Sequence, residues 1–226
     1  MPDAGEADRL PLDPDQIRAL TAVTASGGLV VFPAETVYGL AADPDDADAV
    51  RRMADLKHRD PAKPSSVLFW SVDDALEVLE GAPDLVLRAV SRLLPGPIGL
   101  IVPNPQRRFA PACGDDPTTL GIRVPRLTAT VGSTPTPDAR ARGGHAPPIV
   151  QTSANVAGGP DPRTLAAVPD EVRAGADLLL DAGERPGRPS TIVDLRGVTA
   201  ATPDGWRVVR EGPVTTQAVA AALAGD

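Results

Sequence analysis

Three basic residues, Lys57, Arg59 and Lys63, lie within seven positions of one another, directly before the apolar segment Ser65–Trp70. Arginine offers a planar fork of donors and lysine a compact point charge, so such a cluster can form one wall of a phosphate-binding site. Lys57 and Lys63 are the only lysines among the 22 Lys and Arg residues. Two lysines in a chain that otherwise uses arginine indicate a function at a phosphate, although a solvated helix end would have the same composition.

A single charged residue, Arg123, interrupts the apolar segment Thr119–Val124. Successive side chains of a strand point to opposite faces, so Arg123 lies opposite Ile122 and Val124 and can face a cleft. A buried guanidinium without an anion is costly, and a cleft position would therefore indicate an anionic ligand. An exposed sheet face is the alternative.

Small polar residues follow the apolar pair Ile149-Val150, in the segment Gln151–Pro160. Backbone amides and small side chains after a strand form a suitable nest for phosphate oxygens. The segment is not a P-loop, because no Gly-Lys-Ser/Thr follows it. A plain surface turn remains the other interpretation.

A carboxylate, a hydroxyl and a phenol follow the apolar strand candidate Leu29–Phe32, at Glu35, Thr36 and Tyr38. Pro33 ends the strand, and Gly39 permits a positive φ angle or the close approach of a ligand. Tyr38 is the only tyrosine of the chain. The segment is either a substrate-binding turn or an ordinary loop with a half-buried tyrosine.

The elements that must position these residues alternate irregularly along the chain. Helices are predicted at Asp13–Ala25, Asp46–Leu56, Val72–Leu79, Leu85–Leu94 and Thr215–Leu223. Strands are predicted at Leu29–Phe32, Ser65–Trp70, Gly99–Val102, Thr119–Val124, Ile149–Thr152, Ala174–Leu180, Thr191–Leu195 and Trp206–Arg210. Ala34–Gly39 is predicted as a loop, and Ala129–Pro148 as a mobile loop whose first part keeps a short helix. This order predicts an α/β fold with a mixed twisted sheet and flanking helices.

Composition narrows the class of protein. The 226 residues, 42% of them hydrophobic, predict a single domain with a core at about 13–213 and a short closing helix at 215–223. A net charge of −8 argues against a protein that coats nucleic acid. Cys113 is the only cysteine, which excludes an intrachain disulfide and a four-cysteine metal site. No apolar run approaches a membrane span and no signal region is visible, so we expect a cytoplasmic location and no membrane contact.

Six segments, taken in order, resemble the YrdC-like family of L-threonylcarbamoyladenylate synthases. They are P-A-E-T-V-Y-G-L at 33–40, K-H-R-D-P-A-K-P at 57–64, G-I-R-V-P at 121–125, S-A-N-V-A-G at 153–158, S-T-I-V-D at 190–194 and V-R-E-G at 209–212. Each string is weak by itself, but their order and spacing are specific. The resemblance extends from about Gly28 to Gly212.

The resemblance implies a twisted open α/β sheet around a deep, basic central cavity. It implies an enzyme, a nucleotidyltransferase that makes threonylcarbamoyl-AMP and pyrophosphate from L-threonine, bicarbonate and ATP, with Mg²⁺ accompanying the ATP. A downstream transferase complex would then modify tRNA to N6-threonylcarbamoyladenosine, and a weak RNA contact would fit this setting. No nucleophile–histidine pair is needed, and His58 and His145 are expected to have no partner.

The resemblance also implies roles for ten residues, with no metal ligand among them. Lys57 and Arg59 match the catalytic positions. The ATP-binding positions are matched by Arg59, Lys63, Thr119, Ser153, Asn155 and Arg210, and the threonine-binding positions by Thr36, Arg123 and Ser190.

The chain departs from the family pattern at three positions. Ala34 replaces a usual Thr or Ser, Ala157 replaces a Ser, and Leu68 stands where a family histidine touches threonine. Leu68 leaves an alternative open, namely a YrdC-fold paralogue that binds nucleotide or RNA with altered or no synthase activity. The segment Thr134–Pro148 is expected to be the only lid.

Overall fold

The computed structural model describes residues 9–126 and 146–225. Within these ranges the strands are β1 (Val30–Pro33), β2 (Tyr38–Ala42), β3 (Ser66–Leu68), β4 (Ile98–Pro103), β5 (Thr119–Arg123), β6 (Ile149–Ser153), β7 (Leu178–Leu179), β8 (Thr191–Asp194) and β9 (Arg207–Arg210). The α-helices are α1 (Pro14–Ala25), α2 (Ala47–Leu56), α3 (Val72–Val78), α4 (Asp84–Leu93), α6 (Asp170–Ala174) and α7 (Thr216–Ala224). Two short 3₁₀ helices are η2 (Ala110–Cys113) and η3 (Leu165–Ala167).

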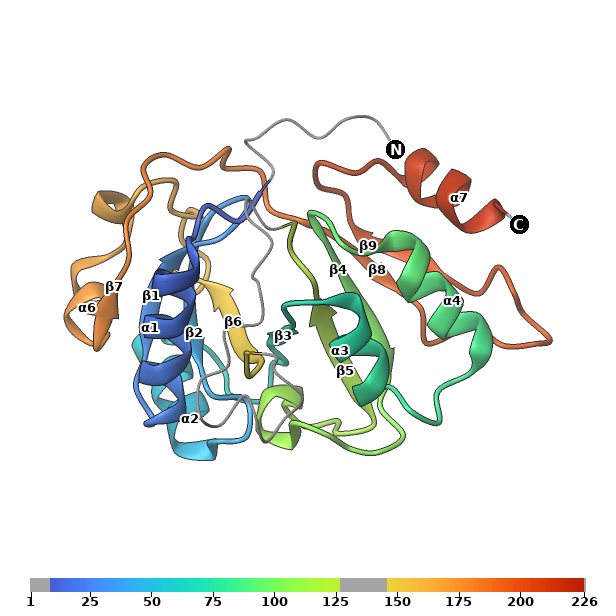
Figure 1. Cartoon of the computed structure of the whole chain (residues 1–226), viewed down its shortest axis with the longest axis horizontal. Coiled ribbons are helices and arrows are strands. Elements are labelled where there is room, and N and C mark those ends of the chain that lie inside the picture. Colours follow the sequence, from blue (N-terminus) through green and yellow to red (C-terminus); the bar gives the residue numbers. More distant parts are fainter. Residues whose placement is uncertain (1–8, 127–145, 226) are drawn as a thin grey trace.

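The described strands form one nine-stranded sheet in the order β7-β1-β2-β6-β3-β5-β4-β8-β9 (Figure 1). The pairs β1–β7, β3–β5 and β4–β8 are parallel, and the other five pairs are antiparallel. The predicted α/β fold with a mixed, twisted, open sheet flanked by helices is confirmed. Sheet neighbours such as β2 and β6 are distant in sequence, so the sheet unites segments from the whole chain.

Helix α1 begins and packs as the sequence predicts. Asp13 accepts a hydrogen bond from the backbone of Gln16, whose side chain in turn accepts one from the Asp13 N–H. This capping box satisfies amides that the first helical turn leaves open. The buried face of the helix, including Ile17 and Leu20, packs against β1 and β2.

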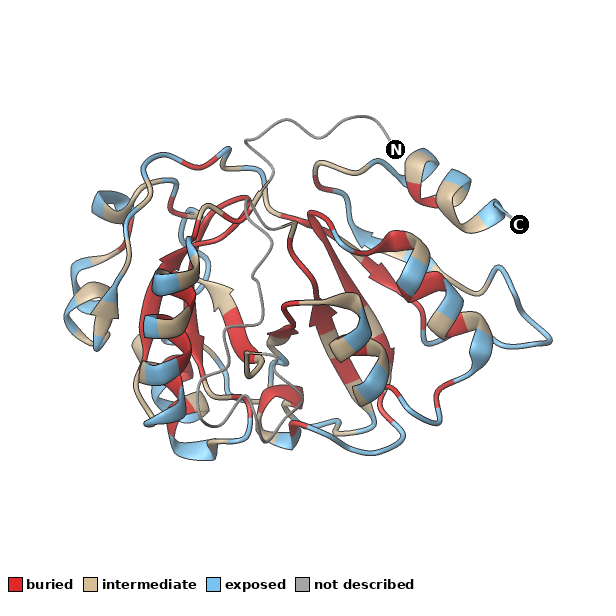
Figure 2. Ribbon diagram, in the orientation of Figure 1, coloured by how far each residue is buried: buried red, intermediate tan, exposed pale blue. Residues whose placement is uncertain are grey.

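Strand β1 is buried on both faces, as predicted from its wholly apolar composition. Val30 and Phe32 belong to a core cluster with Leu20 of α1, whereas Val31 packs in a larger cluster with Met53 of α2. The buried strands occupy the middle of the molecule in Figure 2, with exposed residues on the outer sides of the helices. Full burial of each Val or Phe side chain stabilises the fold by roughly 1.5–3 kcal/mol, so this strand holds the turn that follows it in a fixed position.

Helix α2 places the basic cluster at its C-terminal end. The Asp46 side chain accepts hydrogen bonds from the backbone N–H groups of Asp48 and Ala49 and so starts the helix. The helix ends at Leu56, and Lys57 follows as its C-cap. Further along the sheet, α4 packs on β4 and against α7.

Two sequence predictions of secondary structure were incomplete. The loop predicted at Ala34–Gly39 ends early, because β2 begins at Tyr38 and forms a hairpin with β1. The strand predicted at Ala174–Leu180 is wrong in its first half, since Ala174 ends helix α6 and only Leu178–Leu179 forms a strand. Acidic residues in the first turn of α6 and an Arg in its last turn favour the helix over the alanine-rich strand that we expected.

The predicted mobile loop and lid at 129–148 lie almost entirely outside the described residues. No helix within 9–126 or 146–225 has the length and apolarity needed to cross a bilayer. The closing helix predicted at 215–223 is found one residue later, and the single-domain assignment stays a prediction.

Candidate active site

A cleft of about 310 Å³ lies at the sheet, where the ends of several strands meet the β1–β2 turn. Its lining contains seven of the ten predicted site residues: Thr36, Arg59, Thr119, Arg123, Ser153, Ser190 and Arg210. Lys57 and Lys63 line an adjoining cavity of about 210 Å³, which shares Arg59 with the cleft. Asn155 is in neither lining but is hydrogen-bonded to Lys57. Three arginines line the cleft, whereas the predicted depth of the cavity stays a prediction.

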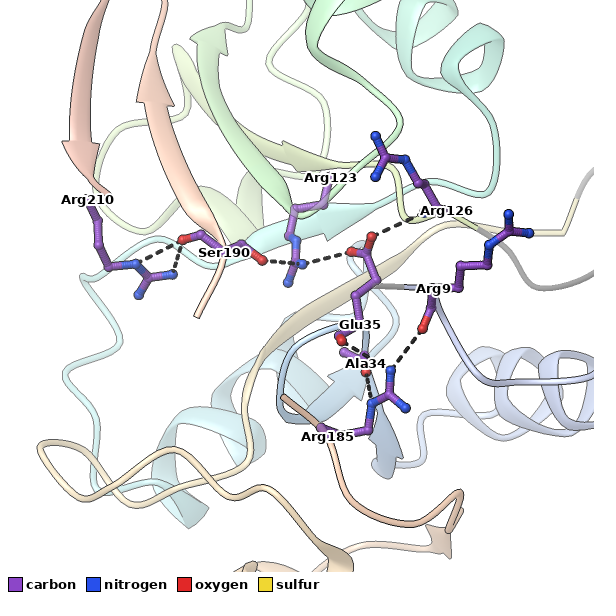
Figure 3. Close-up of polar contacts among 8 residues, drawn as sticks. All are labelled: Arg9, Ala34, Glu35, Arg123, Arg126, Arg185, Ser190 and Arg210. Atoms are coloured by element: carbon purple, nitrogen blue, oxygen red, sulfur yellow. Dashed lines mark hydrogen bonds and ion pairs between the residues drawn. The ribbon is translucent and has the colours of Figure 1, made fainter. Parts of the chain in front are cut away.

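Arg123 points into the interior, where it forms an ion pair with Glu35. Its Nη2 donates to Glu35 Oε2 at 3.1 Å and to Ser190 Oγ at 2.6 Å (Figure 3). Arg123 is only 8% exposed, and its Nε is buried without a hydrogen-bond partner. Burial lowers the pKa of the guanidinium, and the charge of Glu35 opposes this shift. The exposed-face alternative is therefore wrong, and Arg123 is a buried residue of the cleft lining whose Nε has no partner among the described residues.

Glu35 joins Arg123 to two other parts of the chain. Its Oε1 accepts a hydrogen bond from the backbone N–H of Arg126 at 3.2 Å. Its main-chain oxygen accepts one from Arg185, which also donates to the main-chain oxygens of Ala34 and Arg9 (Figure 3). Sequence reasoning gave no role to Glu35 or Arg185. The signal for Glu35 was its place beside Thr36 in the turn after β1, whereas nothing in the sequence identified Arg185.

Thr36 occupies the same turn. It is 1% exposed and lines the cleft, and its hydroxyl has no hydrogen-bond partner within the described ranges. Its main-chain oxygen accepts a hydrogen bond from the Gly187 N–H at 2.7 Å. The turn is therefore fixed by its backbone, and the hydroxyl is left for a ligand.

Lys57 is buried and its ammonium contacts the loop after β6. Its Nζ donates to the main-chain oxygens of Ser153 and Asn155 and to Asn155 Oδ1 at 3.3 Å. An ammonium has three N–H donors, so these three acceptors engage all of them. Burial and, to a lesser extent, the charge of Arg59 lower the pKa of Lys57 to about 8, against the opposing charge of Asp161. In this geometry Lys57 positions the loop, and its predicted direct action on phosphate stays a prediction.

The loop that Lys57 holds contains two of the predicted ATP-binding residues. Ser153 Oγ donates to Asn155 Oδ1 at 2.5 Å, and Asn155 Nδ2 donates to the main-chain oxygen of Gly159 at 2.7 Å. The Ala157 N–H returns a hydrogen bond to the main-chain oxygen of Lys57 at 2.8 Å. The segment is therefore a cross-linked turn that ends at the cleft.

Arg59 is the cation shared by both cavities. Its guanidinium donates to Ser65 Oγ at 3.2 Å, Thr152 Oγ1 at 3.1 Å and the main-chain oxygen of Pro64 at 2.7 Å. Burial lowers its pKa, and Asp60 opposes the shift. All these partners are neutral, so the charge of Arg59 is available to an anion.

Arg210 and Thr119 complete the other side of the cleft. Arg210 donates twice to the main-chain oxygen of Ser190, at 3.1 and 2.9 Å, and so fixes the residue that also contacts Arg123. The Thr119 hydroxyl donates to Asp116, whose pKa is lowered by its hydrogen bonds with Thr118 and Thr119. The geometry thus couples the predicted nucleotide side and the predicted amino-acid side through Ser190.

One expectation about an individual side chain needs correction. His58 was expected to have no partner, but its Nε2 lies 3.5 Å from Glu171 Oε2. His145 lies outside the described residues. Leu68, at the position of the usual family histidine, is 1% exposed and packs with Trp70 and Phe32 in the core cluster under α1. Leu68 is not among the described residues that line the cleft, so position 68 supplies no polar group there.

Comparison with known proteins assigns the chain to a family. The family described as Sua5/YciO/YrdC, "telomere recombination", matches residues 22–212. The chain belongs to the Sua5/YciO/YrdC family.

Relatives within the Sua5/YciO/YrdC family include two named enzymes of similar length. The threonylcarbamoyl-AMP synthase of Chromohalobacter salexigens is 34% identical over 80% of this chain and 94% of its own length. The putative threonylcarbamoyl-AMP synthase of Mycobacterium tuberculosis is 32% identical over 95% of this chain and 94% of its own. The crystal structure of Pyrococcus abyssi Sua5 complexed with L-threonine superposes with a TM-score of 0.75 at 26% identity. The match covers 94% of this chain but 58% of the P. abyssi chain, which is longer.

Proposed function

We propose that this protein is a threonylcarbamoyl-AMP synthase, which makes threonylcarbamoyl-AMP and pyrophosphate from L-threonine, bicarbonate and ATP. The observation that carries the proposal is the cleft, which brings seven predicted substrate residues from six separate segments into one lining. The names of the relatives from C. salexigens and M. tuberculosis, and the L-threonine bound to the P. abyssi protein, support the same activity.

The amino acid would bind at the Glu35 end of the cleft. Arg123 would pair its carboxylate, because its buried Nε lacks an acceptor and a guanidinium forms strong charge-assisted hydrogen bonds with carboxylates. Thr36 and Ser190 would contact the rest of the molecule from the facing segments. The chain's own groups would thereby orient threonine before any chemistry occurs.

The phosphates of ATP would lie between Arg59 and the loop after β6. When a carbamate oxygen attacks the α-phosphate, negative charge gathers on phosphoryl oxygens, and fixed donors aimed at that charge lower the barrier. Arg59 supplies such a charge, and Ser153 lies at the mouth of the loop that Lys57 holds. Arg210 and Thr119 would contact the nucleotide, and Lys63 would contact the phosphates from the adjoining cavity. Asn155 would fix the shape of the loop through its hydrogen bonds.

Several parts of the proposal concern the setting of the reaction. Mg²⁺ would arrive as a component of the MgATP substrate. The product would pass to a downstream transferase complex that modifies tRNA, with at most a weak RNA contact by this acidic chain. We place the reaction in the cytoplasm.

Leu68 favours one second candidate, a paralogue with a different amino-acid specificity or without synthase activity. Because Leu68 is packed in the core, the cleft lacks any hydroxyl-binding group from that position.

Pyrophosphate release tests both candidates. We expect release that requires ATP, bicarbonate and L-threonine together, with L-threonine preferred over L-serine. Release with other amino acids but not with threonine would establish the paralogue, and no release with any amino acid would refute the proposed synthase.

A further inference from the structure

One acidic residue, Asp161, stands among the cations of the cleft. Within the described residues it is the only carboxylate in the lining, which also contains Arg59, Arg123 and Arg210. Asp161 is half-buried and makes no hydrogen bond or close ion pair with any described residue. Its charge nevertheless reaches Lys57, since it opposes the lowering of the Lys57 pKa. A carboxylate that no described residue pairs, in a basic cleft, is suited to bind a cationic part of a ligand.

The backbone fixes the position of Asp161 beside the turn after β1. The main-chain oxygen of the next residue, Pro162, accepts a hydrogen bond from the Tyr38 N–H at 2.8 Å. Tyr38 also accepts one from the Ala154 N–H at 2.8 Å through its own main-chain oxygen. Both ends of the loop from Ala154 to Pro162 are therefore held at the start of β2, next to Thr36. Asp161 is held there by regular backbone pairing and not by its own side chain.

A free α-amino acid carries both charges, so a site for it must satisfy a carboxylate and an ammonium group. Three guanidinium groups around the cleft would repel an ammonium, and in a partly buried site this repulsion is stronger than in water. Glu35 cannot serve instead, because its two carboxylate oxygens accept hydrogen bonds from Arg123 and Arg126. Asp161 is the remaining acceptor of the right charge.

We propose that Asp161 binds the α-ammonium group of the amino-acid substrate and selects for an α-amino acid over its deaminated analogue. The proposal rests on the proposed function, because it assumes that the cleft takes an amino acid. A role as a ligand of Mg²⁺, which proteins bind through one or two carboxylates together with substrate phosphates, would use Asp161 as the single carboxylate of the described lining, and the test below separates it from this proposal. No three His, Cys, Asp or Glu side chains of the described residues gather anywhere as a metal site.

The test compares two ligands that differ by one amino group. Binding of L-threonine and of 3-hydroxybutanoate, which is threonine without its amino group, is measured by calorimetry on wild type, Asp161→Asn, Asp161→Glu and Asp73→Asn. Asp73 is an exposed carboxylate at the start of α3 and is the matched control. We expect Asp161→Asn to weaken threonine binding at least about tenfold, the worth of a charged hydrogen bond, and to leave 3-hydroxybutanoate unchanged. Asp161→Glu should recover part of the preference, and Asp73→Asn should match wild type.

Each other outcome has a distinct meaning. An equal loss for both ligands would show that Asp161 only supports the fold of the cleft, and would overturn the proposal. A preserved threonine affinity with a raised Mg²⁺ requirement for ATP binding would make Asp161 a metal ligand and would also overturn it. If wild type binds and turns over an amino acid while Asp161→Asn keeps the preference, this inference fails and the proposed function stands. If wild type binds no amino acid, both fail.

Discussion

At the scale of single residues, the site depends on a buried charge pair. Arg123 and Glu35 are both almost fully buried and form an ion pair, in which Arg123 also donates to Ser190 and Glu35 also accepts from the Arg126 N–H. Desolvation of two charges costs as much as their attraction returns, so such a pair is a poor device for stability alone. Its presence is better explained by binding, because it holds a guanidinium at the cleft with one donor still unused.

The first prediction separates these two roles of Arg123. Arg123→Met should abolish measurable threonine binding and cost roughly 3–5 kcal/mol of unfolding free energy, because Glu35 is left charged and buried. The double variant Glu35→Gln with Arg123→Met removes the orphan charge, so it should recover most of that stability without recovering threonine binding. Urea denaturation and calorimetry measure the two quantities. A double variant that binds threonine like wild type would show that the carboxylate site lies elsewhere.

Residue types in the sequence indicated this site only in part. Arg123 could be selected because a lone charge in an apolar strand is unusual, and its register then set its direction. Asp161 and Arg185 could not be selected in the same way, because each stands in a loop of ordinary composition. The position of Asp161 depends on backbone pairing with β2, and that of Arg185 on side-chain hydrogen bonds to the main chain at Ala34 and Glu35, neither of which local sequence specifies.

At the scale of elements, the loop after β6 acts as a unit with the end of α2. Lys57 crosses from the helix to hold the main chain at Ser153 and Asn155, and the loop returns a hydrogen bond to Lys57. Because the pKa of Lys57 is lowered from 10.5 to about 8, the ammonium form exists below about pH 8 and is lost above it in the folded protein. The unfolded chain keeps its proton to higher pH, so this group makes folding more favourable, not less, as pH rises from about 8 to 10.5.

The second prediction is that ligand affinity and folding stability respond in opposite directions as Lys57 loses its proton. Affinity for a non-hydrolysable ATP analogue should fall about three- to tenfold between about pH 7.5 and 9.5, because the loop loses one of its three donors. Stability should not fall with it. Calorimetry over this range, with urea denaturation in parallel, measures both.

Two variants make the assignment to Lys57 specific. Lys57→Met should bind the analogue weakly at every pH, with no alkaline fall. Lys63→Met should bind more weakly than wild type but keep the fall. An alkaline fall that survives in Lys57→Met would assign it to another group. Cys113 is not that group, because burial raises the pKa of its thiol and Cys113 is not among the described residues that line either cavity.

Local sequence determines some elements of this fold, whereas others form only through pairing with distant strands. Helix α1 could be located to within one residue, because the signals that start it at Asp13 and Pro14 are local. Strand β2 was missed because Gly39, Ala41 and Ala42 have little intrinsic preference for strands, and pairing with β1 and β6 on both sides creates the strand. Likewise α6 was missed, because it lies in an alanine- and leucine-rich stretch that is too short for hydrophobic periodicity to distinguish a helix from a strand.

At the scale of the whole molecule, an acidic protein presents a basic cleft. The chain carries a net charge of −8, yet the described lining holds three arginines and one aspartate. The acidic remainder disfavours extended nucleic acid, whereas a small anion is bound by the local cluster. The sheet makes this possible, because its order brings the β1–β2 turn, β5, β6 and the β8–β9 edge to one place.

The third prediction tests whether that cleft is a single site across the sheet. Hydrogen exchange with both L-threonine and an ATP analogue bound should be slowed at Thr36–Tyr38 and Thr152–Asn155 on one side, and at Ser190–Ile192 and Arg210–Gly212 on the other. Helix α7 packs on α4, has no residue in the described lining and should be unchanged in its fraying end, which makes it the internal control. With either ligand alone at about 100 times its Kd, unfolding free energy should rise by about 2.7 kcal/mol. Protection confined to one side of the sheet would mean that the two groups of residues bind separately, and a synthase that joins an amino acid to a nucleotide requires them to bind together.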